Sequence, residues 1–222
     1  MQISEVHLLT NSLSQTEFFY KEKLGFKLVE QTDELLCFEV GVSRLWFHKS
    51  DAAENPVYHF AFDIPENQLE AGLEWVGSKA ELIPYEKDKF IVDFSNWNAK
   101  SFYFYDNNGN ILEGIVRYDL LNICNESFGA NSFLKISEVG FAVEDVLTFC
   151  DEINFMYGSD YFVKQPKREN FSVLGDDHGL FIVSSLNRHW YPTEQMAHSY
   201  WTKVIFEIDC QVYQFTFLPQ NS

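Results

Sequence analysis

The order of hydrophobic and polar positions at the N-terminus predicts one strand, one helix and three further strands. Residues 3–10 form an apolar, strand-like run, and Ser12 with Gln15 offers a capping box that begins a helix. The helix ends at Gly25, which suits a left-handed C-cap. Turn residues separate three short strands at 26–30, 35–40 and 44–48. This stretch therefore predicts a β-α-β-β-β unit.

The same order of elements returns in the following sixty or so residues. The pattern predicts a strand at 58–64, a helix at 65–76, and strands at 90–94, 101–105 and 110–117. His7 and His59 then occupy the same place, near the start of the first strand of each unit. We expect the fold to bring these two histidines together, with Glu113 from the last strand of the second unit beside them.

A degenerate third unit follows a polar, turn-rich linker at 119–132. Its first strand begins with Ile136-Ser-Glu-Val139, which repeats Ile3-Ser-Glu-Val6 letter for letter. A helix at 145–153 and strands near Tyr161 and at 171–174, 180–184 and 202–209 complete it. The third unit has Gly140 in place of His7 and Val183 in place of Glu113. The histidines and the glutamate are therefore expected to serve a site made by the first two units, within a domain of residues 1–118, and residues 133–222 form the extra unit.

Composition and charge narrow the classes of partner. The 222 residues carry a formal charge of -17, which repels nucleic acid and anionic lipid, so small molecules, metal ions or a second copy of the chain are the expected partners. A cytoplasmic location is expected, because no basic and apolar signal region and no membrane-length apolar run is present. The four cysteines stand singly, as in buried thiols.

The sequence resembles the vicinal-oxygen-chelate superfamily, which contains glyoxalases, extradiol dioxygenases, fosfomycin-resistance thiol transferases and bleomycin-resistance proteins. The resemblance is carried by Phe19-Tyr-Lys-Glu-Lys-Leu-Gly-Phe26, by His59, and by Asp106-Asn-Asn-Gly-Asn-Ile-Leu-Glu113, and it covers residues 1–118. It implies an α+β fold in which paired β-α-β-β-β modules form a U-shaped cleft that holds a divalent metal.

The resemblance implies His7, His59 and Glu113 as metal ligands, a set suited to Fe, Mn, Ni or Zn. Some members use a fourth ligand from the last strand of the first unit. Aligning Gly41 with Gly109 puts Leu45 opposite Glu113, so His48 fits only if that hairpin slips by three residues. A site of three ligands is therefore expected, and the role of His48 stays open.

The function implied is that of a metal-dependent lyase, dioxygenase or thiol transferase acting on a small molecule that chelates the metal through oxygens. Arg117 would share the face of Glu113 and could hold an anionic group, and Tyr103 or Tyr105 could contact the substrate or donate a proton. No residue is singled out as the general base, for which His48, a tyrosine or a hydroxide on the metal are candidates.

Two alternatives stay open. The chain could be a metal-free binding protein of the bleomycin-resistance kind, whose aromatic cleft sequesters a ligand without chemistry. The third unit could mediate dimerisation or regulation, because a lone unit leaves a sheet without its usual partner.

Overall fold

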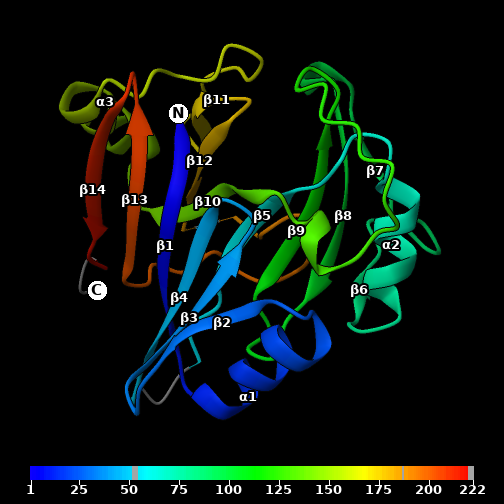
Figure 1. Ribbon diagram of the computed structural model, residues 1–222. Coiled ribbons are helices and arrows are strands. Elements are labelled where there is room, and N and C mark those ends of the chain that lie inside the picture. Colours follow the sequence, from blue (N-terminus) through cyan, green and yellow to red (C-terminus); the bar gives the residue numbers. More distant parts are fainter. Residues whose placement is uncertain (52–54, 187, 220–222) are drawn as a thin grey trace.

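The computed structural model describes residues 1–51, 55–186 and 188–219, and it contains two β-sheets with helices at their margins (Figure 1). The helical elements are α1 (Leu13–Glu17), η1 (Phe18–Lys23), α2 (Leu69–Gly77), η2 (Ser95–Trp97), η3 (Ala130–Ser132) and α3 (Val146–Tyr157). The mixed α+β fold class expected from the sequence is confirmed. None of the described helices is long and apolar enough to cross a membrane.

The first sheet combines the first unit with the C-terminal hairpin. Its strands, in spatial order, are β14 (Gln211–Phe217), β13 (Thr202–Ile208), β1 (Gln2–Thr10), β4 (Ser43–Lys49), β3 (Leu35–Val40) and β2 (Lys27–Gln31). Ser12 caps α1 as expected, since its hydroxyl accepts a hydrogen bond from the Gln15 amide. The chain then continues as a π-helical turn, η1, before Gly25 reverses it with a φ of 72°.

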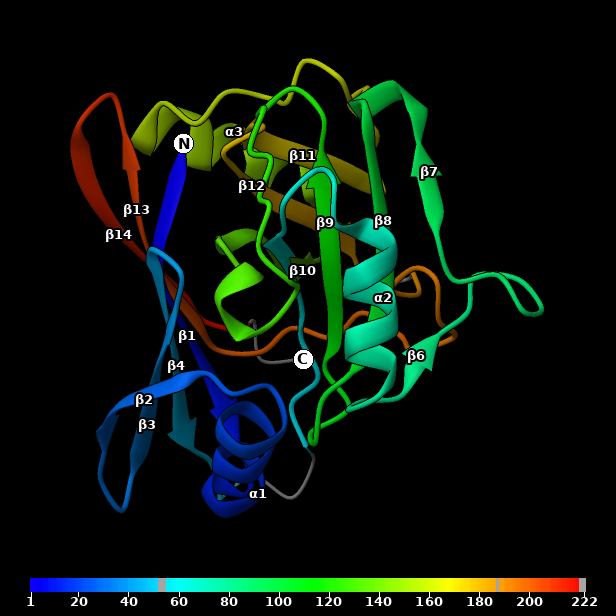
Figure 2. The same ribbon diagram turned by 45° about the vertical axis from the view of Figure 1, so that its right-hand side comes forward.

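The second sheet combines the second and third units. Its path is β11 (Phe171–Asp176), β12 (Gly179–Ser185), β10 (Lys135–Val143), β5 (His59–Asp63), β9 (Ile111–Arg117), β8 (Ala99–Tyr105) and β6 (Leu82–Ile83), with β7 (Val92–Phe94) also paired to β8. Figure 2 shows α2 lying along the part of this sheet formed by β8 and β9. The predicted helix at 65–76 begins only at Leu69, because Pro65 to Gln68 forms a separate turn.

The pairing of the units differs from the expectation. The first and second units were expected to share one cleft, but β1 pairs antiparallel with β13, and β5 pairs antiparallel with β10. Each sheet therefore joins the first strand of a unit to a strand of the C-terminal part of the chain. The first and second units meet instead through their apolar faces, where Phe26 packs edge-on against Phe62 and Phe133.

The repeated Ile-Ser-Glu-Val segments adopt the same irregular backbone. In β1 the pairing register shifts between Ile3 and Glu5, and in β10 it shifts between Ile136 and Glu138. Such a bulge changes the direction of the side chains that follow it. Ser43 lies between the two segments, because its hydroxyl donates to the Ile3 carbonyl and accepts from the Ile136 amide. The four-letter repeat thus encodes two equivalent bulges that meet at one serine.

The segment predicted as a linker is packed against the second unit. Phe128 contacts Trp75 of α2, and the Asn122 side chain accepts a hydrogen bond from the Glu66 amide. Gln68 donates to the Glu126 carbonyl. These contacts attach the segment to α2, so it does not act as a free spacer.

The sequence reasoning missed strand β14. The hairpin that joins β13 to β14 turns at Asp209 and Cys210, which both have positive φ, 50° and 63°. Two-residue turns of this type are usually signalled by Asn-Gly or Asp-Gly, and this pair is neither. Because the turn has no such signal, the sequence does not predict a second strand of the hairpin at residues 211–217.

Candidate metal centre

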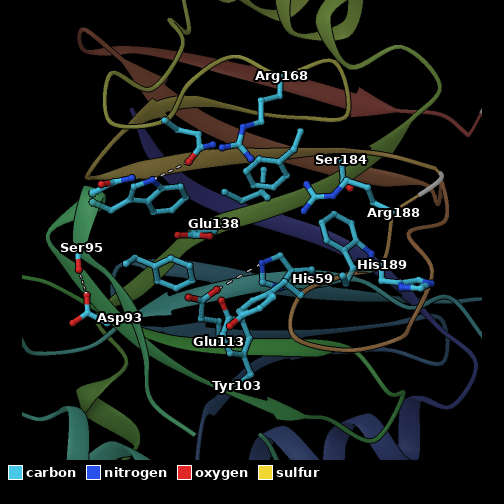
Figure 3. Close-up of a pocket in the computed structure, with 18 residues that line it drawn as sticks. His59, Asp93, Ser95, Tyr103, Glu113, Glu138, Arg168, Ser184, Arg188 and His189 are labelled. Carbon is cyan, nitrogen blue, oxygen red and sulfur yellow. Dashed lines mark hydrogen bonds and ion pairs between the residues drawn. The ribbon is translucent and has the colours of Figure 1, made fainter. Parts of the chain in front are cut away.

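One group of three ligand side chains converges among the residues that the structure describes. His59 lies on β5, Glu113 on the adjacent β9, and Glu138 on β10 at the other side of β5. One ligand atom from each lies within 4.8 Å of the others, and all three side chains are buried. Figure 3 shows the three side chains pointing into one cavity. The two edges of β5 therefore bring two carboxylates to one histidine.

The His59 ring is oriented by the backbone. Its Nδ1 lies 3.0 Å from the Ile111 carbonyl oxygen, which can only accept, so Nδ1 carries the hydrogen and donates. Nε2 then keeps its lone pair, and it lies 3.7 Å from Glu113 Oε2. Burial lowers the pKa of His59 to about 4, so the ring is neutral at physiological pH. A neutral imidazole with a fixed tautomer is the form that binds a metal.

The two carboxyl groups are held in a low-polarity environment next to each other. Burial, together with the negative charge of Glu138, raises the pKa of Glu113 well above its usual range. Burial raises the pKa of Glu138 to about 7, although Arg117 opposes this rise. Two adjacent buried carboxyls cannot both ionise at low cost without a further positive charge between them.

Arg117 holds Glu138 in a buried ion pair. Its Nη2 donates to Glu138, and its Nε lies 3.4 Å from Asp63 Oδ1. Asp63 also pairs with Lys135 at 3.2 Å. Arg117 is 1% exposed and Asp63 is also 1% exposed, so this chain of ion pairs lies inside the sheet. Arg117 therefore positions Glu138 and does not line the cavity, in contrast to the substrate contact expected from the sequence.

The donor set fits a divalent cation. One imidazole nitrogen with a free lone pair and two carboxylates match Mn, Fe or Zn, and a cation would relieve the repulsion between the two acids. His59, Glu113 and Glu138 are the residues that would hold it.

The three side chains open into a cavity of about 460 Å³. Its walls combine polar and charged side chains with six aromatic ones, Phe94, Trp97, Tyr103, Phe171, Trp190 and Tyr191. A volume of this size suits a small organic molecule. The centre of the Trp190 ring lies 5.3 Å from that of the His59 ring, with the two planes tilted by 39°. A Cβ on Gly140 would lie 2.8 Å from Trp190 Cη2. The glycine that replaces histidine in the third unit thus leaves room for this tryptophan.

His7 belongs to the other sheet and does not join His59 and Glu113. In β1 the neighbours Val6 and Leu8 face the core between the sheets, and in β5 Phe60 does the same. Because side chains alternate along a strand, His7 and His59 lie on faces turned away from that shared core. His7 therefore does not join the expected triad, and Glu138 is the side chain that converges with His59 and Glu113.

His7 has partners of its own on the first sheet. Its Nδ1 lies 3.0 Å from His48 Nε2, and its Nε2 lies 3.3 Å from Glu5 Oε2. Trp46 also donates to Glu5. Burial, with Lys203 and His48 adding to it, lowers the pKa of His7 to about 3. The two nitrogens of His7 face different partners, so this cluster does not converge on one point.

The strand register settles the position of His48. His7 lies opposite Trp46, and His59 lies opposite Ile111. Two residues further along, His48 and Glu113 hold equivalent places. The alignment that put Leu45 there was wrong, because Trp46 lies five residues after Gly41, whereas Ile111 lies two residues after Gly109. The difference accounts for the three-residue slip.

The two tyrosines expected to contact a substrate lie on one face of β8 but in different places. Tyr103 lies opposite Glu113 in the ladder, is buried, and lines the cavity. Burial and the charge of Glu113 raise the pKa of Tyr103 well above its usual range, so it keeps its proton and can donate it. Tyr105 is half-buried and lines a separate groove with Phe18 and Phe19 of η1.

Glu138 was missed by the sequence reasoning although its signal was present. It lies within the repeated Ile136-Ser-Glu-Val139, inside an apolar strand where a carboxylate is costly unless it has a partner. The family resemblance covers residues 1–118, so it gives no role to a glutamate of the third unit.

Comparison with known proteins identifies the family. Residues 2–154 match the model of the Glyoxalase/Bleomycin resistance protein/Dioxygenase superfamily, and the chain belongs to this family. All three convergent ligands lie within the matched residues. A comparison with curated proteins finds no match.

One solved structure shares the fold over most of this chain. A candidate dioxygenase of Bacillus subtilis superposes with a TM-score of 0.60 at 14% identity, over 83% of this chain and 63% of that one. This chain therefore corresponds to less than two thirds of the length of that protein. Shorter matches include the fosfomycin resistance protein FosX of Mesorhizobium loti (TM-score 0.38, 17% identity, 51% of this chain and 88% of that one). Another is a lactoylglutathione lyase of Agrobacterium tumefaciens (TM-score 0.40, 20% identity, 51% and 92%).

Proposed function

We propose that this protein is a divalent-metal-dependent enzyme that acts on a small molecule able to chelate the metal through oxygens. The proposed ligands are His59, Glu113 and Glu138. The observation that carries the proposal is their convergence within 4.8 Å at the base of an aromatic cavity. Two buried acids beside a neutral imidazole are costly; Arg117 forms an ion pair with Glu138, and a cation would compensate the charge of Glu113 as well.

The bound cation would act as a Lewis acid that stabilises negative charge on substrate oxygens. The chain supplies the remaining functions. Arg117 fixes the Glu138 carboxylate, and the Ile111 carbonyl fixes the His59 ring. Tyr103 holds a proton next to Glu113, where it can donate to a substrate oxygen. Trp190 and the other aromatic walls exclude water from the reacting atoms.

Metal content measured on purified protein tests the ligand set. Wild type, His59→Ala, Glu113→Gln and Glu138→Gln are incubated with Mn, Fe, Ni or Zn, freed of excess ion, and assayed by elemental analysis. His7→Ala is the matched control, because it removes a buried histidine from the other sheet. We expect about one equivalent in wild type and in His7→Ala, and at least a tenfold weaker affinity in the other three.

Two results would contradict this ligand set. Loss of metal in His7→Ala with retention in Glu138→Gln would restore the triad expected from the sequence. Equal metal content in all five proteins would refute a metal site at these three residues, provided that circular dichroism shows all of the proteins folded.

The second candidate is a metal-free binding protein. The aromatic walls of the cavity favour it, because stacking on Trp97 and Trp190 could retain a planar ligand without any chemistry. Turnover separates the two candidates. An enzyme converts its ligand only after metal loading, whereas a binding protein returns the ligand unchanged with or without metal.

A further inference from the structure

Two arginines line the cavity without an acidic partner. Arg168 lies in the loop before β11, and Arg188 lies in the connection from β12 to β13. Neither forms an ion pair with an acidic side chain within residues 1–51, 55–186 and 188–219. Of the 16 basic residues, eight form ion pairs with acidic side chains in the described part of the chain. Arg168 and Arg188 differ from the other unpaired cations because both line one cavity.

The backbone at both arginines is fixed. The Arg168 amide donates to the Ser172 hydroxyl, and the same hydroxyl donates to the Arg168 carbonyl. The Arg188 amide donates to the Ser185 carbonyl, and the Arg188 carbonyl accepts from the Ala197 amide. Both side chains thus extend from positions that do not need to be ordered when a ligand arrives.

The guanidinium groups are directed into the cavity. The Arg188 guanidinium lies 4.6 Å from the centre of the Phe171 ring, a cation–π contact that holds it in place. Figure 3 shows both arginine side chains reaching toward the middle of the cavity, on the side away from Glu113 and Tyr103. Partial burial, and then the nearby charge of Arg168, lowers the pKa of Arg188. The pair is thus mutually repelling, and an anion between the two groups would remove that repulsion.

We propose that Arg168 and Arg188 bind the oxyanion of the substrate, which is a planar aromatic acid whose opposite end reaches His59, Glu113 and Glu138. The aromatic walls hold the flat middle of the molecule, and planar guanidinium groups match a carboxylate or a phosphonate with two parallel hydrogen bonds. The identification of the ligand as a substrate rests on the proposed function, but the oxyanion site itself does not. Arg168 and Arg188, and not Arg117, are thus the residues proposed to bind the anion.

A pair of matched probes tests the oxyanion site. Binding of 3,4-dihydroxybenzoate and of its neutral amide, 3,4-dihydroxybenzamide, is measured by titration of tryptophan fluorescence in wild type and in the Arg168→Gln/Arg188→Gln double variant. Trp97 and Trp190 in the cavity wall supply the signal. Lys167→Gln is the control, because it removes the same charge one residue from Arg168, where the lysine lies over the Tyr161 ring.

Wild type and Lys167→Gln are expected to prefer the acid over the amide by roughly 10- to 100-fold, and the double variant is expected to lose this preference. Phenylphosphonate and benzoate, compared in the same way, identify the favoured oxyanion. The proposal is overturned if wild type shows no preference for the acid, or binds neither probe, or if the double variant keeps the full preference.

The same titration in metal-free protein separates this proposal from the proposed function. A preference for the acid that persists without metal, in a chain that takes up no metal, leaves the oxyanion site standing while the metal-dependent enzyme is refuted. If wild type and the double variant both take up metal normally but show no preference for the acid, the oxyanion site is refuted and the metal-dependent enzyme stands.

Discussion

Replacing Gly140 by alanine is expected to displace the tryptophan that covers His59. A Cβ at this position would lie 2.8 Å from Trp190 Cη2, 3.0 Å from the His59 carbonyl oxygen and 3.2 Å from His59 Cβ. The first contact is with a ring that is only 5% exposed, and the other two are with the neighbouring strand β5. A shift of residue 140 away from Trp190 therefore increases its steric overlap with β5, and a shift away from β5 increases its overlap with Trp190. Overpacking of this kind costs about 1–3 kcal/mol of the free energy of unfolding.

Urea unfolding followed by tryptophan fluorescence measures this cost. Gly129→Ala is the matched control, because nothing lies within 4 Å of a Cβ at Gly129 and its backbone is extended, with a φ of -168°. We expect Gly140→Ala to lose about 1–3 kcal/mol, to shift the emission of Trp190 toward that of exposed indole, and to weaken metal binding. Gly129→Ala should change the stability by less than about 1 kcal/mol. Equal stability and equal emission spectra for Gly140→Ala and wild type would refute the packing argument.

Three further predictions follow from buried charges and from one turn. Arg117→Met should cost about 3–5 kcal/mol in urea unfolding, because it leaves Asp63 and Glu138 without their shared cation; a loss below about 1 kcal/mol would contradict this. The metal-free protein should lose stability as the pH rises through about 7, because folded Glu138 keeps a proton that the unfolded chain releases near its ordinary pKa of 4.5. Glu138→Gln should therefore gain about 2 kcal/mol on wild type between about pH 5.5 and pH 8.5, and parallel stability curves would disprove the assignment. Changing Asp209 and Cys210 to Asn-Gly should raise the melting temperature, with a gain of about 1 kcal/mol, since both positions have positive φ; an unchanged melting temperature would count against the turn type.

Much of the fold was predictable because its signals are local. Alternation, the Ser12 cap and the turn at residues 106–109 locate most elements within a few positions, and the repeated Ile-Ser-Glu-Val segment locates the first strand of the third unit. His59 and Glu113, two of the three side chains that converge, were expected from the repeated order of elements and from the family resemblance.

The partner of each unit was not predictable from local pattern. β5 would lie at the edge of its own unit, where it could pair with any strand of suitable length and register. The choice between β1 and β10 depends on how the apolar faces of the whole chain pack. That choice decided whether His7 or Glu138 joined the site. Arg168 and Arg188 were missed for a related reason, since loops that approach a cavity from outside the sheet have no periodicity that places them.

The connection that carries Arg188 and Trp190 continues into β13, which pairs with β1 in the first sheet. One end of this segment therefore lines the cavity, and the other end is anchored in the opposite half of the molecule. A small molecule bound by Arg188 would therefore restrain a segment of backbone that runs from the cavity to the first sheet. Occupancy of the cavity should then protect backbone amides of β13 and β14 from hydrogen exchange, although neither strand touches the ligand.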